Sequence, residues 1–451
     1  MNYQAPKGTH DIIGTTSQLF EEVEGLFKQL ATLYGYAPVR TPIFEHTELF
    51  TRSVGDSSDI VRKEMYTFLD KGNRSITLRP EMTAGAMRAI VNAKLDKTAD
   101  LPIKLYYAGP AFRYERPQLG RFRQFHQFGV ETVGVTSPIN DVEAIMLGAY
   151  ALQALGFEHL VVKINSLGDT KSRDAYRDAL KAFFEPKIEG MCADCKDRLN
   201  INPLRILDCK VPADQALAKG APKMSEYLSS DAKQYFDKVK AMLDQYTIPY
   251  VIDDGLVRGL DYYSHVVFEY HLSDEVGSGY GALGAGGHYD NLLQELGGAA
   301  LPGVGFAFGL ERIVAIIEEL KMAPDLSKMI DAYVMPLGQE QVDYAYAVAT
   351  LLRSAGLRTD LSYDAKSVKS QIKKATRLGA KYGLFVGEAE FKTESVKVKN
   401  LETETQEDVP LKQLISYFQA KYQHHHHHDH DCDCDGDCEG EGHECHCKEH
   451  E

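Results

Sequence analysis

The chain has 451 residues, of which 44% are hydrophobic and 25% are charged, so its size predicts two or three domains and its composition is that of an ordinary globular protein. It has no apolar run long enough to cross a membrane and no apolar signal-peptide region at its start, so we expect a cytoplasmic protein with no membrane partner. The net charge of −15 argues against a nucleic-acid partner, but residues 422–451 carry −9 of it (ten acidic residues and one lysine), and binding depends on where basic residues cluster in the remaining body of −6.

Apolar residues at helical spacing between Leu19 and Leu33 predict a first helix, which Thr16 or Ser17 can cap. Strand-like stretches follow at 106–112, 121–133, 161–165 and 266–270. The long gaps between them favour an antiparallel or mixed sheet with insertions, because a regular alternation of strand and helix is absent. A charged, helix-rich stretch over about 169–245 is expected to be an insertion within a first domain that spans 1–325.

The pattern changes near Pro324. Residues 331–336, 358–361 and 382–387 predict strands, and residues 342–355 and 367–378 predict helices. This alternation predicts a compact α/β domain over residues 330–421. The final segment, 422–451, consists mainly of His, Asp, Cys, Glu and Gly, which cannot form a packed core, so we expect a disordered tail.

The most informative segment is 112–131. Pro117 and Gly120 predict a turn between two antiparallel strands. Alternation along the second strand places five side chains on one face: Arg121, Arg123, Phe125, Gln127 and Glu131. Arginines bind phosphate, an aromatic ring stacks on a base, and Gln127 and Glu131 can accept hydrogen bonds from an amine or an imidazole. The arrangement therefore suits a polyphosphate nucleotide, although by itself a solvated hairpin of alternating charge fits it equally well.

This segment resembles motif 2 of the class II aminoacyl-tRNA synthetases, in which the position of Arg113 binds the α-phosphate of ATP and that of Phe125 stacks on adenine. Residues 35–55 resemble motif 1, with Pro42 at the dimer-forming position. Residues 305–312 resemble motif 3, a glycine-rich strand that enters a helix, with Arg312 directed at the nucleotide. The resemblance implies an α+β fold with an antiparallel sheet flanked by helices, ATP with Mg²⁺ as a substrate, and a homodimer.

Two further peptides, 256–263 and 284–290, resemble the signature peptides of the histidyl-tRNA synthetases. A neutral imidazole offers one donor and one acceptor, so a selective pocket needs a carboxylate and a hydroxyl. Glu131 and Tyr263 match the family positions that supply them, and Tyr262 is grouped with the same histidine site. The positions that match those around the α-amino group are Glu81, Thr83 and Gln127. The family's second signature usually has arginine where this chain has His288, and glycine where it has Asn291.

The resemblance covers about residues 5–421 and implies a histidine–tRNA ligase. Such an enzyme activates L-histidine with ATP to histidyl-adenylate and transfers it to the 3′ end of tRNA(His), releasing AMP and pyrophosphate. Arg258 matches the family arginine that contacts the substrate carboxylate and the α-phosphate. Arg113 and Arg258 are therefore the expected catalytic residues, because two cations and Mg²⁺ offset the repulsion between a carboxylate and a polyphosphate.

Two other functions each agree with some of these features: a dinucleotide-binding enzyme and a non-catalytic paralogue. Residues 279–284 fit GxGxxG, but that pattern indicates dinucleotide binding only directly after a strand and at the start of a helix, and a polar segment precedes it here. A non-catalytic paralogue, such as the regulatory subunit of histidine biosynthesis, shares the synthetase core. Those proteins lack the C-terminal anticodon-binding domain and commonly lose the signature residues, whereas this chain keeps both.

Basic residues recur three or four positions apart from Lys366 to Lys381, opposite Val368, Ile372, Ala375 and Leu378. A solvated helix face is the simplest interpretation. In a chain that resembles a synthetase, contact of Lys369, Lys373 and Arg377 with the tRNA backbone is favoured. Arg116 and Gln118, on the turn of the hairpin, are expected to touch the acceptor end.

Cysteines fall into two groups. Cys192, Cys195 and Cys209 have some metal-ligand character, but a structural zinc site needs four ligands and no histidine lies close in sequence, so reduced structural cysteines are favoured over zinc. The tail predicts a flexible appendage that binds Zn²⁺ or Ni²⁺ through His424, His426, His428, Cys432, Cys434, Cys438, Cys445 and Cys447. A purification tag is the alternative for 424–428, although tags seldom continue into Asp-Cys repeats.

Overall fold

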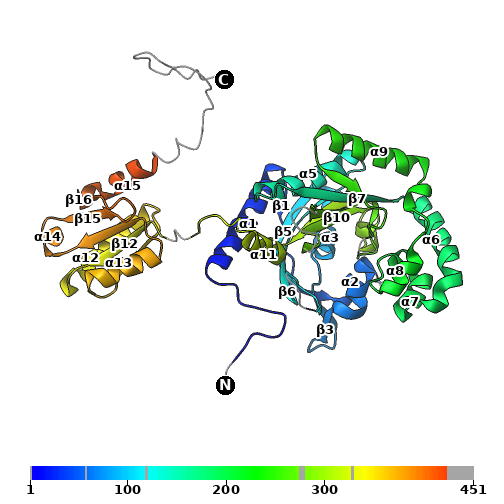
Figure 1. Ribbon diagram of the computed structural model, residues 1–451, viewed down its shortest axis with the longest axis horizontal. Coiled ribbons are helices and arrows are strands. Elements are labelled where there is room, and N and C mark those ends of the chain that lie inside the picture. Colours follow the sequence, from blue (N-terminus) through cyan, green and yellow to red (C-terminus); the bar gives the residue numbers. More distant parts are fainter. Residues whose placement is uncertain are drawn as a thin grey trace, which may run out of the picture. The chain divides into compact units, whose positions relative to one another are not determined.

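The computed structural model describes residues 3–55, 58–116, 120–257, 259–273, 280–326 and 330–423 (Figure 1). The chain divides into two compact units, Met1–Pro324 and Asp325–Glu451. No helix among the described residues is long and apolar enough to cross a membrane. The predicted tail ligands, from His424 to Cys447, lie outside the described residues, as do Gln118 and Arg258.

The first unit is built on an eight-stranded sheet with the order β1-β5-β6-β11-β10-β9-β7-β8. Its strands are β1 (Ala37–Pro38), β5 (Ile103–Phe112), β6 (Gln124–Val133), β7 (Leu160–Gly168), β8 (Tyr250–Ile252), β9 (Ser264–Leu272), β10 (Gly284–Tyr289) and β11 (Gly303–Gly309). Only the two edge pairs, β1 with β5 and β7 with β8, are parallel. The four strands predicted in this region are confirmed, and so is the mixed, mainly antiparallel sheet. Gly284 begins a strand that pairs antiparallel on both sides, which agrees with the rejection of a dinucleotide-binding motif.

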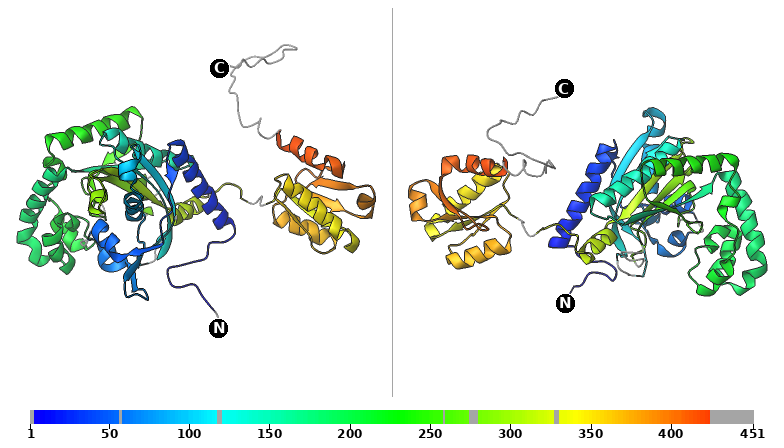
Figure 2. Two further views of the ribbon diagram at one scale, coloured as in Figure 1. Left: turned by 180° about the vertical axis from the view of Figure 1, so that it is seen from behind. Right: turned by 45° about the horizontal axis from the view of Figure 1, so that its top comes forward.

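Helices cover both faces of this sheet (Figure 2). On one face α1 (Thr15–Leu33) packs beside α5 (Pro138–Ala154) and α11 (Leu310–Glu319), and the ring of Phe27 lies 5.3 Å from Phe128 and 4.9 Å from Phe308. On the other face α3 (Thr83–Asn92) and α10 (Leu292–Glu295) pack on β5 and β9. The prediction that Thr16 or Ser17 caps α1 was wrong, because the helix begins at Thr15 with Gly14 at the N-cap position, and Thr16 instead donates to Glu318.

Two smaller substructures border the sheet. A three-stranded antiparallel sheet contains β2 (Phe44–His46), β4 (Ser75–Leu78) and β3 (Tyr66–Leu69), with α2 (Thr47–Val54) beside it. Between β7 and β8 the chain forms α6 (Thr170–Phe184), α7 (Ala193–Ile201), α8 (Pro212–Ala218) and α9 (Ser230–Gln245), joined by 3₁₀ turns. Residues from α6 to the turn at Met224 form a hydrophobic core of their own, so this stretch is a helical insertion.

The second unit is a five-stranded sheet with the order β13-β12-β14-β15-β16. Its strands are β12 (Ala332–Pro336), β13 (Thr359–Leu361), β14 (Tyr382–Val386), β15 (Ser395–Asn400) and β16 (Gln406–Pro410), and its helices are α12 (Val342–Ser354), α13 (Val368–Arg377), α14 (Glu388–Lys392) and α15 (Leu414–Gln423). The predicted strands and helices of the α/β pattern are confirmed. The antiparallel hairpin of β15 and β16 was not predicted, although Val396 and Val398 alternate with polar residues along β15; β16 has only one buried residue, Val409.

Candidate functional site

A small cavity of about 130 Å³ lies on the α3 side of the large sheet. We call it the Glu131 pocket. Its floor is formed by β6, β10 and β11, and its walls by the start of α3 and the segment before β9. The side chains that give it polarity are Glu81, Thr83, Tyr107, Arg113, Gln127, Glu131, Tyr262, Tyr263 and Tyr289. The six sequence-predicted side chains from Glu81 to Tyr263 that were assigned to histidine and that the structure describes therefore line one cavity.

Glu131 is the most heavily hydrogen-bonded group of this pocket. It is 1% exposed, and its carboxylate accepts hydrogen bonds from Thr83 Oγ1 at 2.6 Å, Tyr107 OH at 2.9 Å and Tyr289 OH at 2.6 Å. Burial raises the pKa of Glu131 to about 7, against the lowering effect of these three donors. An added Cβ at Gly305 would collide with the carboxylate, so the glycine of motif 3 makes room for it. The site thus presents an acceptor that is held in one orientation.

Glu81 lies at the start of α3 and faces the same cavity. Its two carboxylate oxygens accept from the backbone N–H groups of Thr83 at 2.7 Å and Ala84 at 3.0 Å, which fixes the side chain at the helix N-terminus. Burial raises the pKa of Glu81, while those two amides and the nearby Arg113 lower it. A cationic or amine-bearing ligand would find two buried acceptors here, Glu81 and Glu131.

Gln127 carries an unused acceptor. Its Oε1 atom is buried and has no hydrogen-bond partner among the described residues. A buried carbonyl without a donor costs free energy, so such a group in a binding pocket indicates a ligand that supplies the missing N–H. Gln127 sits on β6 two positions from Phe125 and four from Glu131, as the strand alternation predicted.

Two tyrosines of this pocket were not predicted. Tyr107 projects from β5 and Tyr289 from β10, and both donate to Glu131. The local sequence does not pair either hydroxyl with Glu131, because β5 lies beside β6, and β10 lies two strands from it, only in the folded sheet. Tyr289 stood inside the peptide that resembled a family signature, and its hydroxyl had no assigned partner. Tyr262 and Tyr263 form the opposite wall with ring centroids 4.6 Å apart, and burial raises the pKa of Tyr262.

A second cavity, of about 170 Å³, adjoins the first. We call it the arginine pocket. It is lined by Arg113, Glu115, Arg121, Phe122, Phe125 and Arg312, with glycine and alanine residues of β10 and β11 as its floor. Arg113 and Gln127 line both cavities, so ligands that occupied the two would meet at these residues.

Two arginines of this pocket donate hydrogen bonds to backbone carbonyl oxygens. Arg113 donates from Nε to the carbonyl oxygen of Pro80 at 2.8 Å, and its guanidinium lies 5.3 Å from the ring centre of Phe125. Arg312 donates to the carbonyl oxygen of Ala282 at 2.6 Å, while its buried Nε has no partner among the described residues. Burial and the proximity of Arg121 lower the pKa of Arg312, an environment that favours an anionic ligand.

Glu311 fixes the helix that carries Arg312. Its carboxylate accepts from the backbone N–H of His126 at 2.8 Å and contacts Nδ1 of the same residue at 2.8 Å, which ties α11 to β6. The hydrogen bond to Glu311 raises the pKa of His126. Arg312 follows Glu311 in the first turn of α11 and lines the same pocket as Phe125.

Other residues of the predicted hairpin have different surroundings. Strand β6 begins at Gln124, so Arg121 and Arg123 precede it and do not share its alternation, which corrects the predicted five-residue face. Arg123 stacks on Tyr114 at 3.8 Å from the ring centre and does not line the arginine pocket. Arg116 is exposed.

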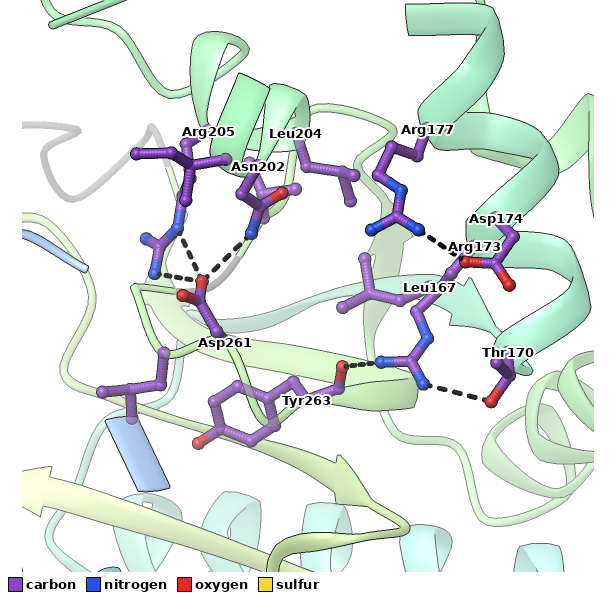
Figure 3. A pocket seen from close by; sticks show the side chains of 13 residues that line it. Leu167, Thr170, Arg173, Asp174, Arg177, Asn202, Leu204, Arg205, Asp261 and Tyr263 are labelled. Carbon is purple, nitrogen blue, oxygen red and sulfur yellow. Dashed lines mark hydrogen bonds and ion pairs between the residues drawn. The ribbon is translucent and has the colours of Figure 1, made fainter. Parts of the chain in front are cut away.

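The helical insertion holds the segment that precedes Tyr262. Figure 3 shows Asn202 and Arg205, both from the insertion, directed at the Asp261 carboxylate. Their nitrogens lie 3.1 Å and 3.0 Å from Oδ1 of Asp261, and its backbone N–H donates to the carbonyl oxygen of Val54 at 3.1 Å. The wall of the Glu131 pocket is therefore anchored to the insertion and to α2.

His288 lies outside the linings of both cavities. It is 2% exposed, with Nδ1 3.2 Å from Asp141 and Nε2 3.3 Å from Asp290. The imidazole joins β10 to α5 through Asp141, so this position contacts neither cavity.

In the second unit, helix α13 carries the predicted basic side chains. Lys369, Lys373 and Arg377 are exposed and follow one another at intervals of four residues. Lys373 and Arg377 also line a cavity with Lys366 and Lys374. Val368 was predicted on the apolar face but is 43% exposed, because it is the first residue of the helix.

Comparisons with known proteins agree with this geometry. Residues 8–313 match the family model described as histidyl-tRNA synthetase, and residues 331–421 match an anticodon binding domain. The chain is 47% identical over 418 residues to a histidine–tRNA ligase of Geobacillus thermodenitrificans (92% of this chain, 98% of that protein) and 46% identical over 423 residues to one of Bacillus subtilis (93% and 99%). It is similar to the crystal structure of apo histidyl-tRNA synthetase of S. aureus with a TM-score of 0.79 and 38% identity, covering 93% of this chain and 100% of that one.

Proposed function

Since the chain belongs to the histidyl-tRNA synthetase family, we propose that its Glu131 pocket binds L-histidine and its arginine pocket binds ATP. The chain is a histidine–tRNA ligase, which activates histidine with ATP and joins it to tRNA. The observation that carries the site assignment is that Arg113 and Gln127 line both cavities. The carboxylate of a histidine in the first cavity would reach the α-phosphate of ATP in the second at this junction.

Recognition of the imidazole is assigned to Glu131 and Tyr263, and recognition of the α-amino group to Glu81, Thr83 and Gln127, with Tyr262 as a wall. Glu131 accepts from the imidazole N–H, and its orientation is fixed by Tyr107, Tyr289 and Thr83. The unpaired Oε1 of Gln127 is the acceptor for the ammonium group. An analogue that lacks either donor leaves a buried acceptor without a partner, which polar pockets penalise by about 10⁴-fold or more.

Activation needs no general base. An oxygen of the ionised carboxylate attacks the α-phosphorus, a new bond forms between that oxygen and phosphorus, and the bond to the pyrophosphate oxygen breaks. Arg113 balances the negative charge that develops at the α-phosphate, Phe125 stacks on the adenine, and Arg312 binds the polyphosphate. Arg258 is assigned to the same step by its match to the family position. ATP enters as its magnesium complex.

Transfer completes the reaction. A terminal ribose hydroxyl of tRNA(His) attacks the carbonyl carbon of histidyl-adenylate, AMP leaves, and the adenylate phosphate accepts the hydroxyl proton. The second unit, residues 330–421, is proposed to bind the tRNA through Lys369, Lys373 and Arg377, whose exposed cations suit a phosphate backbone. Arg116 and Gln118 are proposed to touch the acceptor end.

A homodimer is proposed through the segment that resembles motif 1. Ile43 and Phe44, next to Pro42, are 44% and 59% exposed, and exposed apolar side chains of this size are typical of an interface. Sedimentation at micromolar concentration tests it, since a monomer would contradict the assembly.

We also propose a cytoplasmic location, where tRNA is charged, and metal binding by the tail. Removal of residues 424–451 should then lower Zn²⁺ or Ni²⁺ stoichiometry without loss of aminoacylation.

The deciding experiment is ATP–pyrophosphate exchange with each of the standard amino acids in turn. Exchange with histidine alone supports the assignment of the two cavities. If no amino acid supports exchange, the pocket residues do not form an activating site and the proposal fails. Exchange with another amino acid would place a different ligand in the Glu131 pocket.

A further inference from the structure

The helical insertion contains a compact cluster of thiols and a carboxylate, away from both substrate cavities. Cys192, Cys195, Cys209 and Asp214 each direct one potential ligand atom inward, and these four atoms all lie within 4.8 Å of one another. Cys195 is 0%, Cys209 4% and Asp214 1% exposed, while Cys192 is partly exposed. Three of these residues were noticed in the sequence, and Asp214, on α8, supplies the fourth potential ligand atom.

The spacing of the cluster fits tetrahedral coordination. The sulfurs of Cys192 and Cys209 are 3.9 Å apart, and the Cys209 sulfur is 3.2 Å from Oδ2 of Asp214. Thiolates bound about 2.3 Å from a tetrahedral Zn²⁺ lie about 3.8 Å from one another. A disulfide would require about 2.05 Å. The observed separation matches the distance between two sulfur ligands of one ion and excludes a disulfide.

The carboxylate of Asp214 is buried and forms no ion pair with a described residue. Its donors are the backbone N–H of Cys192, at 3.1 Å from Oδ2, and the thiol of Cys209. A buried carboxylate is costly unless it is paired or coordinates a metal. Three thiolates favour a soft or borderline ion over Ca²⁺ or Mg²⁺.

We propose that Cys192, Cys195, Cys209 and Asp214 bind one structural Zn²⁺. Binding replaces the three thiol protons, which are released to solvent, with three zinc–sulfur bonds, and the Asp214 oxygen supplies the fourth. Cys192 precedes α7 and Cys195 lies in its first turn, where the N-terminal end of the helix favours thiolates. The partly exposed Cys192 gives the ion a way in. No further ligand position is left for a substrate.

The ion would hold together three short segments of the insertion core: the start of α7, the end of the turn after Ile206, and α8. Asn202 and Arg205, which bind Asp261 beside the wall of the Glu131 pocket, lie in the stretch of chain between the first two of these segments (Figure 3). The zinc therefore stabilises the insertion that positions this wall, while the ion itself takes no part in the chemistry.

Peptide-resolved labelling of the native full chain tests the site without interference from the tail cysteines. The chain is produced with zinc in the medium, purified without a metal-affinity column, and treated with N-ethylmaleimide before and after chelation. We expect the peptide that contains Cys192 to react at least about tenfold faster once the metal is removed. Total zinc should fall by one ion per chain in Asp214→Ala, with the tail unchanged in both proteins.

Two variants complete the test. Asp214→His offers another zinc ligand and should keep both the zinc and the protection of Cys192. Asp197 is an exposed residue of the same helix, α7, and pairs with Arg62. Asp197→Asn should change neither the zinc content nor the labelling of Cys192. If Asp214→Ala fails to fold, the labelling of the parent chain still decides. Equal labelling before and after chelation, a disulfide between Cys192 and Cys209, or a metal other than zinc in the cluster would overturn the proposal, whatever the result of the exchange assay.

Discussion

Nδ1 of His288 lies 3.2 Å from the carboxylate of Asp141, and both side chains are buried. Burial lowers the pKa of His288, but the charges and hydrogen bonds of Asp141 and Asp290 outweigh it and raise the pKa to about 9. The imidazole is therefore a cation at neutral pH. The resemblance noted in the sequence predicts arginine at this position, and His288 carries a positive charge there through its two carboxylate partners.

This pair predicts how stability depends on pH. The folded pKa of about 9 is above the ordinary 6.5, so the stabilisation is fully present below pH 6.5 and is lost as pH rises through 9. At about 1.4 kcal/mol for each pKa unit, it amounts to roughly 3 kcal/mol. Denaturant unfolding should show His288→Gln less stable by about that amount at low pH and little different at high pH. His288→Arg should remove the pH dependence, and a parallel loss of stability at every pH would contradict the assignment.

Glu131 predicts the histidine affinity. In Glu131→Gln the three hydroxyl donors and the imidazole face an amide, so the KM for histidine should rise about 100-fold or more while the KM for ATP changes little. Tyr289→Phe should give a smaller rise, since two donors to Glu131 remain. The matched control is Tyr36→Phe, which loses a buried hydrogen bond to Thr132 outside the pocket lining. Steady-state exchange kinetics measure all three, and equal KM values in Glu131→Gln and the parent would remove Glu131 from the histidine site.

The unpaired carbonyl of Gln127 predicts how the α-amino group is recognised. Imidazolepropionate has the imidazole and carboxylate of histidine but no α-amino group, so it should inhibit the parent only weakly. Gln127→Ala should lose about 1–3 kcal/mol of histidine binding and almost none of imidazolepropionate binding, because only histidine used that acceptor. Inhibition constants for the two ligands, measured on the parent and on Gln127→Ala, form a double-mutant-type cycle. An equal loss for both would mean that Gln127 supports the pocket without contacting the amine.

Substitutions of Arg113 and of Arg312 should change different kinetic constants. Arg312 lines only the arginine pocket, so Arg312→Ala should raise the KM for ATP and leave the KM for histidine unchanged. Arg113 lines both cavities, so Arg113→Ala should lower kcat by about 10²-fold or more, as expected for a group that acts in the transition state. Exchange kinetics with each substrate varied in turn distinguish these outcomes, and identical profiles of the two variants would refute the division of roles.

The basic side chains of α13 should matter for tRNA and not for activation. Lys373→Glu with Arg377→Glu should weaken aminoacylation of tRNA(His) and reduce its salt dependence, by about one unit of slope for each lost phosphate contact, while exchange stays unchanged. Lys392→Glu, on α14 of the same unit, reverses an equally exposed charge that pairs with Glu388 and serves as the control. A matching loss in the control would indicate general repulsion of the tRNA by added negative charge.

The sequence was sufficient to predict the strand around Phe125 and Glu131, because side chains alternate along a strand whatever packs on it. It also predicted that Arg113, Arg312 and the peptide around Tyr263 belong to one site, through motifs whose order along the chain matches the family. The α/β pattern of the second unit was readable for a similar reason, since its apolar strands and helices follow local periodicities.

Only the tertiary structure revealed Tyr107 and Tyr289 on Glu131, the partners of His288, and Asp214 among the cysteines. Several of these contacts join segments far apart in the chain: 24 residues separate Tyr107 from Glu131 and 147 separate His288 from Asp141. Local periodicity carries no information about which buried carboxylate faces which donor across a sheet or between helices. The sequence therefore determined the elements and the family, while packing decided which side chains share a hydrogen bond, a charge or a metal.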